Sequence, residues 1–160
     1  MKKILISLLS LVVLISFFSF NSTAVNNTFV PYVIDFVVTT NMTDVSSENE
    51  SRATGLIASY SLSLAKSGTT LNIEGMTNCS QEVIKCGFKN LIIQRRKTSS
   101  DSWEDYYDYG NVYVETCAAG LSTTLVVETG YQYRISCKHY AKKNILSVET
   151  IANTSNIVNV

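Results

Sequence analysis

The chain has very little histidine and proline, with one of each, His139 and Pro31. A single histidine excludes metal motifs that need a histidine pair, and it argues against most serine-triad arrangements. No long apolar run follows residue 24, so we expect the processed chain not to be an integral membrane protein. No cysteine precedes Cys79, which argues against lipid attachment at an N-terminal cleavage point.

The N-terminus has the pattern of a secretory signal. Lys2 and Lys3 precede an apolar run over residues 4–20, and the small residues Ser22 and Ala24 follow it. Signal peptidase recognises small residues at this spacing, so we predict a signal peptide over residues 1–24 and a secreted, extracellular product. The alternative is an uncleaved anchor, because the run is near the lower limit for crossing a bilayer.

Positive and negative charges are nearly balanced. Without Lys2 and Lys3, the thirteen basic residues become eleven against thirteen acidic, a net charge of −2. From Arg52 onward eleven basic residues stand against nine acidic, so the acidic excess lies before that position. This balance argues against nucleic acid as a partner.

Two regions follow the predicted signal. Residues 25–51 contain a short apolar piece at 33–38, a candidate strand, and then a polar, acidic stretch that cannot bury enough apolar surface to offset its ordering entropy. We therefore predict a linker or pro-segment over 25–51, largely disordered. Residues 52–160 have the length of one domain.

Side chains alternate between apolar and polar through most of residues 52–160, which is typical of half-buried strands. The pattern begins with Leu56, Ala58 and Tyr60 on one face and Ile57 and Ser59 on the other. Turn residues separate about seven such segments, which predicts an all-β, antiparallel β-sandwich of the immunoglobulin or fibronectin III type. The predicted strands are 56–64, 71–77, 88–96, 103–114 (one strand or two), 121–127, 131–139 and a last one from 146 to 151 or beyond.

The segment 130–137 resembles the penultimate strand of immunoglobulin-like and fibronectin III-like domains, where a tyrosine after a glycine turn anchors a corner through its hydroxyl. Tyr133 matches that position best, and Tyr131 is the alternative. More widely, residues 52–160 resemble a family of small secreted proteins of Gram-positive bacteria whose domain has no assigned function. The matching parts are Arg52, Gly55-Leu56, Gly68, 71–77, 91–95, Trp103, 130–134 and His139. The resemblance implies a fold and an extracellular location, and it implies no active-site residue.

Four cysteines in an exported chain predict up to two disulfides. Among the three possible connectivities we favour Cys79–Cys86, which closes a short loop, together with Cys117–Cys137. In a reducing compartment the same residues would be buried thiols.

Cys137 and His139 are candidates for a nucleophile and its base, and together with Cys79 and Cys86 they are candidates for a zinc site. The pair lies at i and i+2 on one strand face, and a core cysteine beside a strand-end histidine explains it without a third orienting group. The spacings are not those of structural zinc modules. We therefore predict no catalytic residue, no cofactor and no metal ion.

The best candidate for a partner surface is an aromatic hairpin. Aromatic rings beside carboxylates are a common means of holding sugars, although glycosidase carboxylates lie in a cleft that nothing in this sequence predicts. The simpler interpretation is an exposed edge hairpin with Trp103 turned inward and its acids facing residues 95–97. The aromatic residues are Trp103, Tyr106, Tyr107 and Tyr109, and the acids are Asp101, Glu104, Asp105 and Asp108.

These features predict a secreted, non-enzymatic β-sandwich module that binds an extracellular protein or glycan. The alternatives are a structural or accessory secreted domain without a ligand and, third, a hydrolase. A hydrolase requires a pocket with perturbed titratable groups.

Overall fold

The computed structural model describes residues 29–40, 50–51 and 55–160, so the predicted signal over residues 1–24 lies outside the described residues. No helix in the described part of the chain has the length and apolar character that a membrane crossing requires. The strands are β1 (Tyr32–Thr39), β2 (Glu50–Ser51), β3 (Ile57–Ser67), β4 (Thr70–Cys79), β5 (Lys85–Arg96), β6 (Glu104–Val114), β7 (Ala118–Val126), β8 (Gln132–Asn144), β9 (Ser147–Thr154) and β10 (Val158–Asn159).

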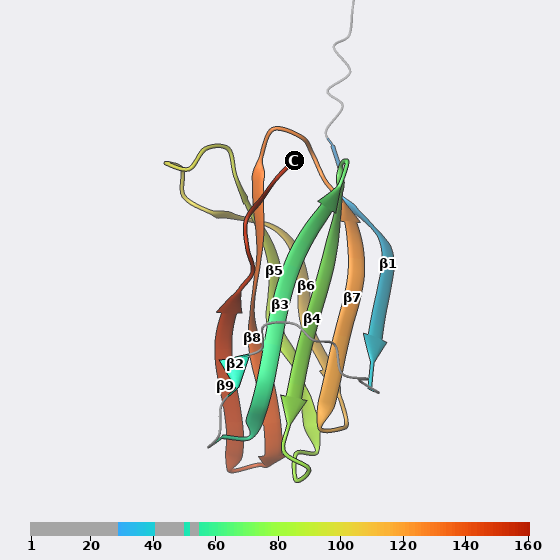
Figure 1. Ribbon diagram of the computed structural model, residues 1–160, viewed down its shortest axis with the longest axis vertical. Coiled ribbons are helices and arrows are strands. Elements are labelled where there is room, and N and C mark those ends of the chain that lie inside the picture. The colour runs from blue at the N-terminus through green and yellow to red at the C-terminus, as the bar shows by residue number, and fades with distance from the viewer. Residues whose placement is uncertain (1–28, 41–49, 52–54) are drawn as a thin grey trace, which may run out of the picture.

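These strands form two antiparallel sheets that pack face to face (Figure 1). The first sheet has the order β1-β7-β4-β3-β2, and the second has the order β10-β8-β5-β6, with β9 also paired to β8. The predicted all-β, two-sheet architecture is confirmed. The described residues contain more strands than the seven predicted, because β1, the short β2 and the short β10 add to them, and residues 103–114 form the single strand β6.

Strand β8 shows most clearly how alternation builds the core. Tyr133, Ile135, Cys137, His139 and Ala141 are all buried, while the residues between them face outward. Successive side chains of a strand point to opposite faces, so every second residue of β8 meets the other sheet. The rest of the apolar interior comes from the other strands in the same way, with Leu71, Ile73, Phe88, Leu91, Ile93 and Leu125 fully buried.

The start of β3 departs from the predicted pattern. We expected Leu56, Ala58 and Tyr60 to share one face, but Ile57 is fully buried and Ala58 is exposed. The pairing register with β4 shifts between Ile57 and Ser59. Such a β-bulge inserts one extra residue and reverses the face on which the earlier side chains lie. The simple alternation is thus correct for β3 only after the bulge.

Part of the segment predicted as a linker belongs to a sheet. Residues 32–39 form β1, which pairs along β7 from Tyr32↔Val126 to Thr39↔Gly120 and lies at the edge of the first sheet. Pro31 immediately precedes this strand, and an edge position tolerates a residue that cannot donate a backbone hydrogen bond. The apolar piece at 33–38 is what makes the strand, while residues 41–49 lie outside the described residues.

Candidate functional site

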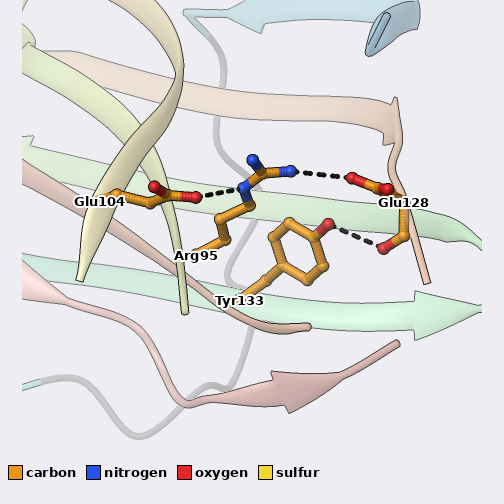
Figure 2. A network of polar contacts seen from close by, with 4 residues as sticks. All are labelled: Arg95, Glu104, Glu128 and Tyr133. Carbon is orange, nitrogen blue, oxygen red and sulfur yellow. Dashed lines mark hydrogen bonds and ion pairs between the residues drawn. The ribbon is translucent and has the colours of Figure 1, made fainter. Parts of the chain in front are cut away.

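The end of β5 carries an arginine that joins the two sheets. The Arg95 guanidinium lies over the rings of Tyr106 and Tyr131, at 4.5 and 4.4 Å from their centroids. It also pairs with Glu104 at 2.6 Å and with Glu128 at 3.0 Å (Figure 2). Glu128 follows β7 of the first sheet, so this arginine of the second sheet bridges both layers. Only 22% of its side chain is exposed, so its charge is used within the fold.

Tyr133 lies beside this arginine and fixes the same corner. Its ring is fully buried, and its hydroxyl donates a hydrogen bond of 2.7 Å to the backbone carbonyl of Glu128, as Figure 2 shows. Burial raises the pKa of Tyr133, so the hydroxyl stays protonated and able to donate. This is the arrangement expected of a tyrosine that anchors the turn between two sheets. The corner is therefore a structural element.

A second group of side chains lies around Trp103, on the outer face of the second sheet. The guanidinium of Arg96 lies 4.4 Å from the Trp103 ring centroid, and that of Arg134 lies 4.3 Å from it. Arg96 and Arg134 both occupy outward positions of their strands. Arg96 lies opposite Gln132 and Arg134 lies opposite Gln94. Along β8 these positions alternate with buried residues. We call Arg96, Trp103 and Arg134 the Arg–Trp cluster. Trp103 is thus not the inward core residue that the sequence predicted.

The charges of this cluster are not neutralised. Among the described residues, neither Arg96 nor Arg134 pairs with a carboxylate. Their partners are neutral: Arg96 donates to Gln132 at 2.8 Å and to the Ser99 carbonyl at 3.1 Å, and Arg134 donates to Gln94 at 2.9 Å. Partial burial, and then the charge of Arg96, lower the pKa of Arg134. Asp101 acts on Arg96 only through a charge interaction without direct pairing. Two adjacent guanidiniums that form no ion pair make a site that an anion would stabilise.

The other aromatic residues of the predicted partner surface lie elsewhere. Tyr106 packs against Arg95 and meets the edge of Tyr133 at 5.5 Å. Tyr107 meets Tyr109 at 4.8 Å, and Tyr109 packs against other side chains that raise its pKa, by burial, to about 12. A register shift adds Tyr106 as an extra residue in β6, so Tyr106 and Tyr107 both pack against the core. The four residues therefore do not share one exposed surface.

The carboxylates of the hairpin are each engaged separately. Glu104 pairs with Arg95, and Asp105 accepts from the Gln94 amide at 2.8 Å. Asp108 accepts from the backbone N–H of Gly110 at 2.7 Å, two residues along β6. In the β5–β6 loop, Asp101 accepts from Thr98, and these hydrogen bonds lower the pKa of Asp101. None of these contacts brings two of the acids together.

The cysteines are free thiols in the described structure, in contrast to the predicted disulfides. Cys79 and Cys86 lie within hydrogen-bonding contact, which raises the pKa of Cys79, with burial adding to it, and lowers that of Cys86. The backbone of Cys79 donates to the Cys117 carbonyl at 2.8 Å. Cys137 instead contacts His139 on β8, at 3.9 Å. The favoured Cys79–Cys86 pair is thus adjacent, whereas Cys117 and Cys137 have different neighbours.

His139 is a neutral core residue. It is fully buried, and burial lowers its pKa to about 4. The Asn153 amide lies 3.2 Å from Nε2, which makes that nitrogen the acceptor and leaves Nδ1–H to donate to the Thr77 hydroxyl at 2.7 Å. Burial also raises the pKa of Cys137 to about 12. A neutral imidazole beside a protonated thiol lacks the activation that a cysteine nucleophile needs.

No three histidine, cysteine or acidic side chains of the described ranges are grouped so that they could hold a metal ion. The zinc set considered from the sequence is divided accordingly, with Cys79 and Cys86 in one place and Cys137 and His139 in another.

Sequence reasoning missed a set of outward residues on β5 and β8. Lys89 lies directly opposite Lys138, and Lys85 lies directly opposite Lys142. We call these four residues the lysine ladder. The signal was present in the sequence, because residues 134, 138 and 142 have the same parity as the outward residues of β8. Their cross-strand partners on β5 could not be identified without the register.

No family model, no curated protein and no solved structure matches this chain. The resemblance to secreted proteins of Gram-positive bacteria therefore stays a prediction, and function has to be inferred from the chain's own residues.

Proposed function

We propose that the protein is an exported, non-enzymatic binding module that recognises an extracellular glycan carrying negative charge, with the Arg–Trp cluster as its primary contact. The observation that carries this proposal is the pair of guanidiniums, Arg96 and Arg134, that lie over one indole ring without a carboxylate partner in the described chain. Guanidinium groups bind carboxylate, sulfate and phosphate oxygens through two parallel hydrogen bonds.

The role of Trp103 in this proposal is to position the arginines. A guanidinium that rests on an aromatic face keeps its charge and loses side-chain freedom before the ligand arrives. Gln132 and Gln94 hold the Nε–H groups of Arg96 and Arg134. The Ser99 carbonyl accepts from one terminal N–H of Arg96, and the remaining terminal N–H groups are the main donors for an anion. The site is therefore preorganised for a negatively charged group.

We further propose that β3–β9 form a sandwich of the fibronectin III type, with β1 as an additional edge strand. In support, β3-β4-β7 lie side by side in one sheet and β6-β5-β8-β9 in the other. The hydrogen bond from Tyr133 to the Glu128 carbonyl has the form of a tyrosine corner. A fold of this kind has no activity of its own, so the proposed function depends on the surface side chains.

Binding of the purified protein to an immobilised acidic polysaccharide tests the proposed function. The R96Q/R134Q variant should bind about tenfold more weakly than the unaltered protein. Its affinity should also depend less on salt, because two charged contacts are lost. The control variant K143Q removes a positive charge near the end of β8, where Lys143 pairs with Glu82 and not with the cluster, and it should bind as the unaltered protein does. Equal binding by R96Q/R134Q and the unaltered protein, or no binding by either, would refute the proposal.

A further inference from the structure

The lysine ladder is an unfavourable arrangement for the fold alone. Lys89 and Lys138 are both exposed and directly opposite each other, and Lys85 and Lys142 face each other four residues further along. Like charges at directly opposed positions of an antiparallel pair destabilise a sheet. An external negative charge bound on this face would offset the repulsion of the two pairs.

The neighbouring strands supply little of that negative charge. Among the described residues, Lys89, Lys138 and Lys142 form no ion pair, and Lys85 pairs with Glu115 at 2.7 Å. The residues of β9 opposite the outward positions of β8 are uncharged: Val148, Thr150, Ala152 and Thr154. On the β6 side, Asp105 and Asp108 bond to neutral groups, the Gln94 amide and the Gly110 N–H, so their charges border the face and pair with none of the four lysines. The centre of this face is thus positive from the Arg–Trp cluster to Lys142.

An aromatic pair lies between the two lysine steps. Tyr113 of β6 and Tyr140 of β8 are both directly opposite Gly87, one on each side of β5. Because Gly87 has no side chain, the two rings meet above it, with centroids 4.8 Å apart. Lys85 lies over the Tyr113 ring at 5.3 Å. Aromatic faces pack on the apolar faces of sugar rings, so this pair adds a sugar-binding platform to the charged face.

The spacing of the positive steps distinguishes between ligands. Arg134, Lys138 and Lys142 follow each other at intervals of four residues along β8. At about 3.3 Å per residue, neighbouring steps are roughly 13 Å apart and the whole row is roughly 26 Å long. A single carboxylate or phosphate cannot reach two steps, whereas an extended polymer with regularly repeated negative groups can reach all three.

We infer that the ligand is a linear acidic polysaccharide that lies along β5 and β8. The inference rests on the proposed function and extends it. The Arg–Trp cluster binds one end of the chain, and the lysine ladder binds further anionic groups. Tyr113 and Tyr140 pack on a sugar ring between the two steps of the ladder. The repeated anionic group is a carboxylate carried by the sugar rings themselves, as in a uronate.

A nucleic acid fits this face less well than an acidic polysaccharide. A nucleic-acid strand has one charge every ~3.4 Å, so most of its phosphates would lie between the positive steps without a partner. The acidic side chains of β6 border the face and would repel a wide, densely charged duplex. A polysaccharide with spaced charges meets the steps and avoids that edge.

The test measures affinity against ligand length. The probes are oligosaccharides with one uronate per disaccharide, from disaccharide to decasaccharide, and a short glycerol-phosphate oligomer. The unaltered protein should bind longer chains progressively more tightly until the ligand spans the face. K89Q/K138Q should bind the disaccharide unchanged but lose about tenfold for the decasaccharide, with the slope of log affinity against log salt smaller by about two. Because the substitution removes a like-charge contact, its thermal stability should not fall.

The outcomes separate this inference from the proposed function. If K89Q/K138Q binds the decasaccharide as tightly as the unaltered protein while R96Q/R134Q does not, the extended ligand is wrong and the Arg–Trp cluster still binds an anion. If the unaltered protein binds none of the probes, both are wrong. Equal affinity for a DNA duplex of matched length would refute the polysaccharide class. Tighter binding of the glycerol-phosphate oligomer, which has no sugar ring, than of the decasaccharide would also refute the polysaccharide class.

Discussion

Acidification should destabilise this protein through a single buried residue, His139. The pKa of this histidine is lowered by burial from 6.5 to about 4. The unfolded chain therefore takes up a proton near pH 6.5, while the folded protein resists it until about pH 4. A group whose pKa is depressed by folding gives stability that is complete above the unfolded pKa and is lost as the pH falls through the folded pKa.

The environment of His139 explains why the folded protein resists the proton. Its ring is in contact with Tyr60 and Phe88, at centroid distances of 4.9 and 5.4 Å. The Asn153 amide donates to Nε2, and protonation of Nε2 would place two donors against each other. The difference of 2.5 pKa units between the two states corresponds to about 3 kcal/mol of unfolding free energy lost between pH 6.5 and pH 4.

Urea unfolding followed by circular dichroism at a series of pH values between 7 and 4 measures this loss. Carboxylates also titrate near the lower limit, so the comparison is with His139→Gln, which keeps a neutral side chain capable of hydrogen bonding. The variant should start about 1–3 kcal/mol less stable at pH 7, because the histidine contacts are imperfectly replaced. Its stability should then fall by about 3 kcal/mol less than that of the unaltered protein. Parallel curves for the two proteins would refute the reasoning.

Further perturbations test other parts of the structure. Tyr133→Phe removes the hydrogen bond to the corner carbonyl and should lower the unfolding free energy by about 1–3 kcal/mol in the same assay, and no change would contradict an anchoring role. Gly87→Ala should prevent soluble expression or lower the melting temperature strongly, because φ is +146° and an added Cβ would lie 2.1 Å from a backbone carbonyl oxygen, so wild-type stability would contradict that close approach. Under oxidising conditions, thiol alkylation and peptide mass spectrometry should find Cys79 joined to Cys86, and free alkylated thiols at both positions would count against this pairing. Intact mass of protein recovered from the medium should correspond to cleavage after Ala24, and retention of the full chain in cells would contradict export.

The proposed binding face shows how far the sequence could predict a site. Trp103 was identified because aromatic residues cluster visibly around it, yet its companions Tyr106, Tyr107 and Tyr109 pack against the interior. The overall charge is close to zero and argued against a polyanionic ligand. Net charge is a sum over the chain, however, and it cannot report that basic side chains share one face of β5 and β8.

The sequence by itself determined that the chain is an all-β sandwich, because alternation depends only on neighbouring residues and on the geometry of a strand. It also identified Tyr133, since the glycine turn before it is local. Only the tertiary structure decided that Lys89 faces Lys138 and that Gly87 lies between Tyr113 and Tyr140. These contacts depend on register, and the bulges in β3 and β6 that set register are fixed by packing between residues far apart in the chain.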